Sequence, residues 1–120
     1  MRMGLVVLSV VVAACSNGVG APVVTVPGGD SERGKELVEV YACGSCHVVP
    51  RVIGADSKVG PPLTGFAQRA YIAGELPNNA QNLIRWIVNP RAIEPNTAMP
   101  PMGVTVPEAR DLAAFLYTLK

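Results

Sequence analysis

The sequence has little charge and few aromatic side chains. Charged residues make up 16% of its 120 residues and aromatic residues 5%, whereas an average soluble protein has roughly 25% charged residues. The formal net charge is +1, no lysines or arginines cluster, and only two phenylalanines occur. These absences exclude the basic surface and the stacking platform of a protein that binds nucleic acid. With 12 glycines, 11 prolines and no repeat period, the chain is one small domain with many turns.

No apolar run is long enough to span a bilayer, which needs about 18 to 20 residues. The run from Gly4 to Val12, just after Arg2, instead fits the hydrophobic part of a secretory signal. The small residues before Cys15 resemble a bacterial lipoprotein signal, in which the cysteine becomes the first residue and is acylated. We therefore predict a leader over residues 1–14 and an exported domain, periplasmic or on the outer face of a membrane, anchored by lipid on Cys15. The alternative is ordinary cleavage nearby, which leaves a spare thiol.

Residues 15–30 are predicted to form a flexible tether. They are rich in glycine, proline and small polar residues, carry no charge before Asp30, and lack a helical period. A flexible chain of this length has an r.m.s. reach of about 20 Å. One short strand over residues 23–26 is an alternative, which the flanking prolines and glycines disfavour. The folded domain is placed at residues 31–120.

The most specific pattern in the chain is the run CGSCH from Cys43 to His47. A C-x-x-C-H run is typical of covalent haem attachment. Two thiols three positions apart on a tight turn can each bond a vinyl group of one porphyrin, and the next residue then lies beneath the iron. The pattern predicts thioether links at Cys43 and Cys46, with His47 as an axial ligand of one haem c.

Three other kinds of site use the same residues. A zinc site needs four ligands, and the sole other cysteine, Cys15, lies across the tether. A redox dithiol of the thioredoxin type expects a βαβ setting, which this helical and proline-rich neighbourhood lacks. A structural disulfide fits an exported protein, but it leaves the adjacent histidine unexplained. Haem is favoured because it uses all three side chains.

A second axial ligand from the protein has to be methionine, because His47 is the only histidine. Beyond the leader only Met99 and Met102 remain, both in a loop rich in proline. Prolines restrict the backbone and so hold a weak sulfur ligand in place. The alternative is that both side chains serve packing.

Residues 31–120 resemble a class I bacterial cytochrome c, including the cytochrome c domain fused to the second subunit of some haem-copper oxidases. Besides the cysteine motif, the resemblance rests on RGKELV at Arg33–Val38, GPPLTG at Gly60–Gly65, the stretch from Leu83 to Met99, and LAAFL at Leu112–Leu116. It implies an all-α fold, with three to four helices and long loops wrapped around one covalently bound haem. Only the segment from Val48 to Val59 has a length that does not match the family.

The resemblance also implies roles for single residues. It places Met99, not Met102, at the sixth ligand position, and it directs the carbonyl of Pro61 to the Nδ1 proton of His47. That contact fixes the imidazole ring and makes it more basic.

Three further residues are candidate haem contacts. Trp86 is expected beside the methionine or at a haem propionate, with core packing as the alternative. Arg69 is a candidate to neutralise a propionate, unless it is an ordinary solvated charge. Thr97 either hydrogen-bonds a propionate or shapes the loop.

Helix signals accompany these motifs. A capping box at residues 105–108 predicts a helix that runs to the end of the chain. Caps at residues 30–31 and at residues 78–79 predict two others, the second of which ends before a proline. Gly34 is predicted to allow a close approach of Phe115.

These features together predict a monomeric, membrane-tethered monohaem cytochrome that shuttles single electrons and is not an enzyme. The resemblance implies a quinol-oxidising complex as donor and a terminal oxidase as acceptor. Removal of the leader leaves nine basic against nine acidic side chains, so docking through a small apolar patch with modest salt dependence is expected. Two alternatives stay open: an accessory haem subunit fixed in a larger redox enzyme, and a haem enzyme or gas sensor with a labile sixth ligand.

Overall fold

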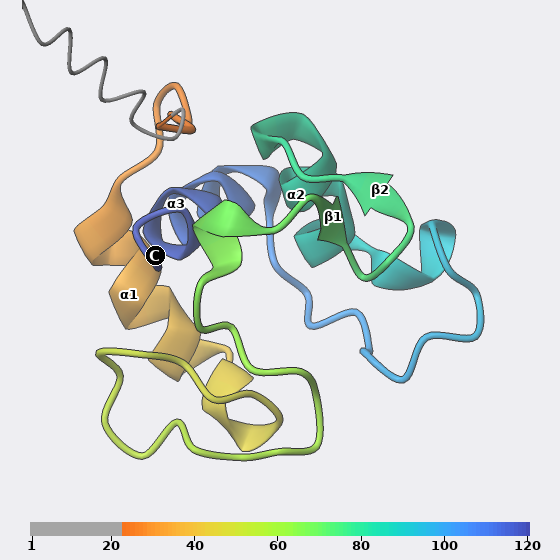
Figure 1. Ribbon diagram of the computed structural model, residues 1–120, viewed down its shortest axis with the longest axis horizontal. Coiled ribbons are helices and arrows are strands. Elements are labelled where there is room, and N and C mark those ends of the chain that lie inside the picture. The colour runs from red at the N-terminus through yellow and green to blue at the C-terminus, as the bar shows by residue number, and fades with distance from the viewer. Residues whose placement is uncertain (1–22) are drawn as a thin grey trace, which may run out of the picture.

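The computed structural model describes residues 23–120, so the predicted leader and Cys15 lie outside the described part of the chain. The α-helices are α1 (Ser31–Val40), α2 (Ala80–Val88) and α3 (Val106–Leu116), and 3₁₀ turns lie at Cys43–Ser45, Phe66–Gln68 and Pro90–Ala92. The mostly helical fold is confirmed, with one addition that was not predicted (Figure 1). Strands β1 (Tyr71–Ile72) and β2 (Leu76–Pro77) pair antiparallel, with Ile72 opposite Leu76.

Side chains cap the start of each helix. The Asp30 carboxylate accepts hydrogen bonds from two backbone N–H groups of the first turn of α1, both at 3.0 Å. Asn79, rather than Asn78, caps α2. Thr105 and Glu108 form the expected capping box at α3. Because a cap satisfies backbone donors that have no partner within the helix, these polar residues decide where each helix begins.

Helix α3 ends at Leu116, so the prediction that it runs to the end of the chain is wrong. Both the backbone N–H and the hydroxyl of Thr118 donate to the carbonyl of Phe115, at 2.9 and 2.6 Å. This carbonyl is therefore engaged in a tight turn. Leu119 beyond it is still buried.

Helices α1 and α3 pack closely at Gly34. A Cβ on this residue would lie 2.0 Å from the carbonyl oxygen of Asp111 and 2.9 Å from the Cβ of Phe115. The predicted approach of Phe115 is confirmed, and the backbone of α3 comes closer still. Around this contact Leu37 and Val38 of α1 are buried against α3, and Phe115 is among the largest fully buried side chains.

The chain is already in contact with the domain before α1 begins. Val24 and Val26 pack against the core, and no strand forms at residues 23–26. The backbone N–H of Asp30 donates to Asp111 of α3 at 2.9 Å. Contacts with the domain therefore already include Val24 and Val26, ahead of the predicted domain boundary at residue 31.

None of the helices in residues 23–120 combines the length and the apolar character needed to cross a bilayer.

Candidate functional site

The site begins where α1 stops. Ala42 has a left-handed backbone, with φ of 52°, and this turns the chain sharply out of the helix. The carbonyl of Cys43 then accepts hydrogen bonds from the N–H groups of Cys46 and His47, at 3.2 and 3.0 Å. This tight turn holds the two thiols and the imidazole on one short stretch of chain. Both cysteines are free and half-buried, and burial raises the pKa of the Cys43 thiol.

A second loop, from Gly60 to Leu63, is held against this turn. The N–H of Gly60 donates to the carbonyl of Cys46 at 2.6 Å, and the N–H of Leu63 donates to the carbonyl of Val48 at 2.9 Å. Between these two contacts, Nδ1 of His47 lies 2.7 Å from the carbonyl oxygen of Pro61. Three successive residues, Cys46 to Val48, thus each form a hydrogen bond with the Gly60–Leu63 loop.

The contact with Pro61 sets the tautomer of the neutral imidazole ring. A carbonyl oxygen only accepts hydrogen bonds, so in that ring the hydrogen is on Nδ1 of His47 and the lone pair is on Nε2. Nε2 is therefore available as a metal ligand, while the backbone sets the orientation of the ring. Within the described residues no group of three or more His, Cys, Asp or Glu side chains could hold a metal ion. Two free thiols beside an oriented imidazole fit a covalently attached haem.

Gly60 is a functional residue that the sequence analysis did not single out. A Cβ at this position would lie 2.6 Å from Cε1 of His47 and 2.9 Å from its Nδ1. Only glycine lets the backbone approach the face of the ring this closely. Gly60 directly precedes Pro61 in the GPPLTG stretch that carries the family resemblance, and this position could have identified it.

The two methionines differ in burial. Met99 is half-buried against the core, whereas Met102 is 41% exposed. Thr97 accepts a hydrogen bond from the Met99 N–H at 3.3 Å, so the described role of its hydroxyl is to shape the loop. Burial thus favours the same methionine as the resemblance does.

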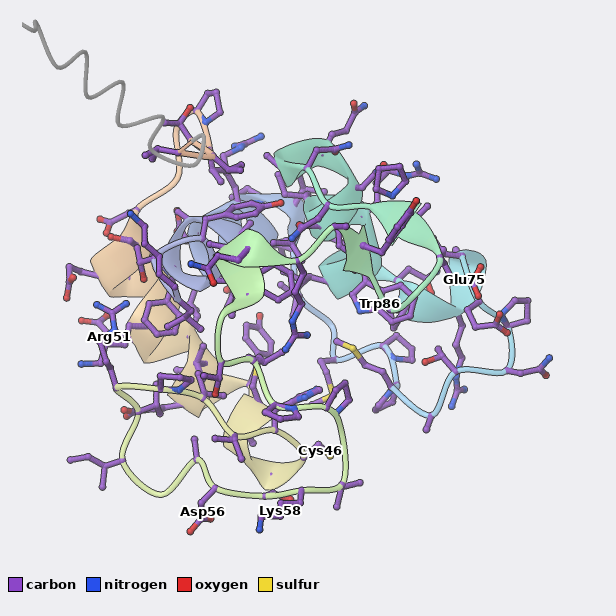
Figure 2. All side chains as sticks on the ribbon, in the orientation of Figure 1. Cys46, Arg51, Asp56, Lys58, Glu75 and Trp86 are labelled. Carbon is purple, nitrogen blue, oxygen red and sulfur yellow. The ribbon has the colours of Figure 1, made fainter. Side chains whose placement is uncertain are left out.

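Trp86 and Arg69, both considered as haem contacts, have protein contacts of their own. Trp86 is buried in α2 and forms part of the core, nearer the middle of the molecule than Cys46 (Figure 2). Arg69 donates to the carbonyls of Pro62 and Thr64, and its guanidinium lies 5.5 Å from the centre of the Phe66 ring. Arg69 therefore braces the loop that holds the imidazole.

The segment from Val48 to Val59, which has no match in the family, forms a compact loop over the cysteine turn. Ala55 packs so close to Gly44 that a Cβ there would lie 2.8 Å from the Cβ of Ala55. Arg51 pins the loop to the end of α3, since its guanidinium hydrogen-bonds Thr118 and lies 5.1 Å from the centre of the Phe115 ring. Ile53 at the tip is fully exposed.

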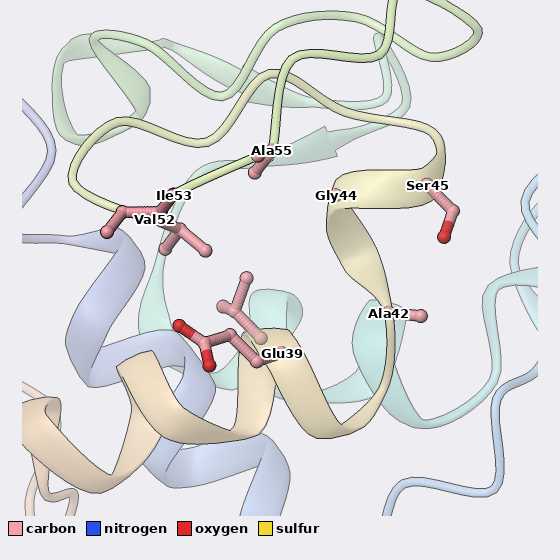
Figure 3. A pocket seen from close by; sticks show the side chains of 9 residues that line it. Glu39, Ala42, Gly44, Ser45, Val52, Ile53 and Ala55 are labelled. Atoms are coloured by element: carbon pink, nitrogen blue, oxygen red, sulfur yellow. The ribbon is translucent and has the colours of Figure 1, made fainter.

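A hollow of about 340 Å³ lies between this loop, the end of α1 and the cysteine turn (Figure 3). Val52 and Ile53 line it on one side, and Glu39 and Ser45 line it on others. Neither His47 nor Met99 lines this hollow, so it is separate from the predicted iron site.

A polar contact that sequence reasoning missed joins the end of α1 to the start of α3. The Tyr41 hydroxyl donates to Glu108 at 2.7 Å, and the Thr105 hydroxyl donates to the same carboxylate oxygen at 2.6 Å. Hydrogen bonds from Thr105 and then from Tyr41 lower the pKa of Glu108 from 4.5 to about 2. Tyr41 immediately precedes Ala42, so this contact holds the helix end from which the cysteine turn departs.

Asn78 makes a second set of hydrogen bonds that the sequence analysis did not predict. Its amide donates to the carbonyls of Phe66 and Arg69, at 3.1 and 3.0 Å, and its oxygen accepts from the Tyr117 hydroxyl at 2.8 Å. Burial raises the pKa of Tyr117 to about 12, which keeps the hydroxyl protonated as a donor. Asn78 thus ties the middle of the chain to the end of α3.

The comparisons with known proteins cover the same part of the chain. The cytochrome c family model matches residues 31–120. The chain is 33% identical over 91 residues to cytochrome c oxidase subunit 2 of Alkalihalophilus pseudofirmus, which covers 75% of this chain and 26% of that subunit. It is 32% identical over 71 residues to cytochrome c oxidase subunit 2 of Bacillus subtilis, covering 58% and 20%. The chain thus spans about a quarter or less of the length of these two relatives.

Among solved structures, cytochrome c2 from Paracoccus denitrificans has a similar fold, with a TM-score of 0.56 at 22% identity over 75% of this chain and 95% of that one. The chain belongs to the cytochrome c family. It therefore carries one covalently bound haem c, and Cys43 and Cys46 lie in the position of the attaching pair.

Proposed function

We propose that this cytochrome c is a lipid-anchored electron carrier, in which His47 and Met99 are the axial ligands of the haem iron. The observation that carries the proposal is the 2.7 Å contact between Nδ1 of His47 and the carbonyl of Pro61. When bound, the haem supplies an iron that gains and loses one electron. The protein's task is to keep both ligands in place during that change, so that little rearrangement accompanies each transfer.

Each side of the proposed iron site has its own support. On the histidine side, Gly60 lies against the ring and the Pro61 carbonyl accepts a hydrogen bond from Nδ1, so the ring has little freedom to rotate. On the methionine side, Thr97 accepts from the backbone of Met99, and Pro100 follows directly. Methionine opposite histidine raises the iron potential, compared with two histidines or a thiolate.

The anchor and the partners are proposed on separate grounds. Lipid on Cys15, following a leader at residues 1–14, would hold the exported domain on a membrane surface. A terminal oxidase is the proposed electron acceptor, because two relatives are named cytochrome c oxidase subunit 2. A quinol-oxidising complex is the proposed donor, by analogy with the family.

The same relatives favour a second candidate, an accessory haem subunit that stays docked in a larger redox enzyme. Purification from membranes in mild detergent separates the two. A free carrier elutes alone, whereas an accessory subunit co-purifies with one partner at a constant ratio.

The ligand assignment is tested with Met99→Ala, using Met102→Ala as the matched control. We expect Met99→Ala to lose the weak sulfur-to-iron absorption band of the oxidised protein and to bind carbon monoxide when reduced. Met102→Ala should retain the band and exclude carbon monoxide. Carbon monoxide binding by the unaltered protein would instead support the haem enzyme or gas sensor.

A further inference from the structure

A groove of about 460 Å³ runs between α2, the Pro90–Ala92 turn and α3. Its apolar lining includes Ile84, Val88, Ile93 and Val106. The first three are half-buried and Val106 is 49% exposed. The buried residues of α2 are Leu83, Trp86 and Ile87, which differ from the residues of this helix that line the groove. Helix α2 therefore has a second apolar edge, which the core covers only in part.

Two arginines, Arg85 and Arg110, line the same groove. Neither pairs with a carboxylate in the described part of the chain, where the one ion pair joins Arg33 to Asp111. Arg85 has only a 3.5 Å contact with the side chain of Asn82.

The acidic side chains near the groove in sequence are engaged elsewhere. Asp111, which directly follows Arg110, pairs with Arg33 and accepts a hydrogen bond from the N–H of Asp30. Glu108 holds Thr105 and Tyr41, and Glu94 accepts from the N–H of Asn96. An apolar hollow bordered by cations without carboxylate partners is suited to the boundary between lipid chains and anionic headgroups.

The segment from Val24 to Asp30 lies beside this groove. A Cβ on Gly28 would lie 3.5 Å from Cδ of Arg110, and one on Gly29 would lie 2.8 Å from the Arg110 carbonyl oxygen. The chain that leads back to Cys15 therefore leaves the domain next to an arginine of the groove. Eight residue steps separate Cys15 from Val23, which span at most about 28 Å.

We propose that the face formed by this groove and the segment Val24–Asp30, here called the groove face, rests on an anionic lipid surface, with Arg85 and Arg110 at the headgroup phosphates. The proposal rests on the lipid anchor of the proposed function. Figure 1 shows the segment ahead of α1 at the top of the molecule and the turn after α1 at the bottom, with α1 and α3 between them. The haem-attachment turn would then point away from the membrane, toward soluble or protruding partners.

The test uses the full, haem-loaded protein in vesicles of phosphatidylcholine, with and without phosphatidylglycerol. Carbene footprinting and mass spectrometry report the exposure of each side chain. We expect Val106 and Arg110 to be protected severalfold in the vesicles with phosphatidylglycerol, while Ile53, fully exposed on the loop at the other end, keeps its labelling. Protection of Ile53 instead of Val106, or equal labelling of both in the two kinds of vesicle, would overturn the proposal.

A matched pair of variants separates contact with headgroups from general attraction. Arg85→Gln removes one cation from the groove, and Lys58→Gln removes one exposed cation near Cys46 at the opposite end (Figure 2). Because one cation near an anionic surface contributes about 1 kcal/mol, Arg85→Gln should lower the equilibrium constant for seating the groove face on the vesicle roughly fivefold, and the protection of Val106 should fall with it. Lys58→Gln should leave it unchanged, and an equal effect of both variants would overturn the proposal.

The intact mass of the mature protein distinguishes this proposal from the anchor on which it depends. Acyl groups on Cys15 without protection of Val106 would overturn the groove face and leave the anchor standing. A mature chain without acyl groups would overturn both.

Discussion

The interface between α1 and α3 buries side chains on both helices, whereas the turn at Cys43–Ser45 buries none completely. At the interface, Gly34 lets two backbones meet and Phe115 is fully buried. At the turn, the chain is held by backbone hydrogen bonds, such as those of Gly60 and Leu63. The first region is stable through packing of its own side chains, while the second depends on backbone contacts and on the haem that the family carries.

Removing the haem attachment should have the largest effect. It should destabilise the cysteine turn much more than the interface between α1 and α3. In the double variant Cys43→Ala/Cys46→Ala we expect amide protection against hydrogen exchange to be lost across residues 43–63, with some protection left in the centre of α3. The reason is that packing at Gly34 does not involve the haem. Hydrogen exchange read by mass spectrometry measures both segments, and native protection of residues 43–63 without haem would contradict the comparison.

Gly34→Ala should break the packed region in the haem-loaded protein. The added Cβ meets a backbone oxygen at 2.0 Å, so the helices must move apart. We expect a loss of about 3 kcal/mol in the free energy of unfolding, at the upper end for overpacked cores. Glu36→Ala, at an exposed position of the same helix, is the control for denaturant titration. A loss equal to that of the control would mean that the approach of α1 to α3 is less tight than described.

Gly60→Ala should perturb the other region with a smaller cost. The new methyl group displaces the His47 ring and weakens its hydrogen bond to Pro61, which contributes about 1 kcal/mol. We expect the free energy of unfolding to fall by about that amount and the reduction potential of the haem to shift. An effect on packing alone would not shift the potential. Potentiometry compares it with Thr64→Ala, an exposed residue of the same loop. An unchanged potential in Gly60→Ala would show that the ring orientation does not depend on this glycine.

The contact between Tyr41 and Glu108 links the two regions and should make the free energy of unfolding depend on pH. The pKa of Glu108 is about 2 in the folded protein and near 4.5 when unfolded, so the folded state binds fewer protons between these values. Its stabilising contribution is complete above pH 4.5 and is lost as the pH falls through about 2. Denaturant titrations across this range should show a smaller change with pH for Glu108→Gln, and an intermediate one for Tyr41→Phe. Identical pH dependence in all three proteins would argue against the shared hydrogen bonds.

Local signals in the sequence were sufficient for the helix starts and for the cysteine motif. Asp30, Asn79 and the capping box at residues 105–108 act on neighbours within one turn, so a short stretch of sequence contains the whole interaction. The contact of Tyr41 with Glu108 joins residues 67 positions apart, and no local pattern encodes that pairing.

The early docking of the chain at Val24 escaped prediction for a related reason. Its composition is that of a linker, and contacts with the core and with Asp111 of α3, both distant in sequence, hold it against the domain. Likewise, the resemblance singled out Pro61 but not Gly60, whose importance depends on a ring that reaches it from another part of the chain.

The hold of Arg51 on Thr118 couples the loop over Gly44 to the turn that follows α3. The two residues are 67 positions apart in the sequence, so this contact exists only where α3 is folded and packed. A disturbance at the end of α3 is therefore transmitted to the backbone beside the cysteine turn, although no residue of α3 belongs to the CGSCH run.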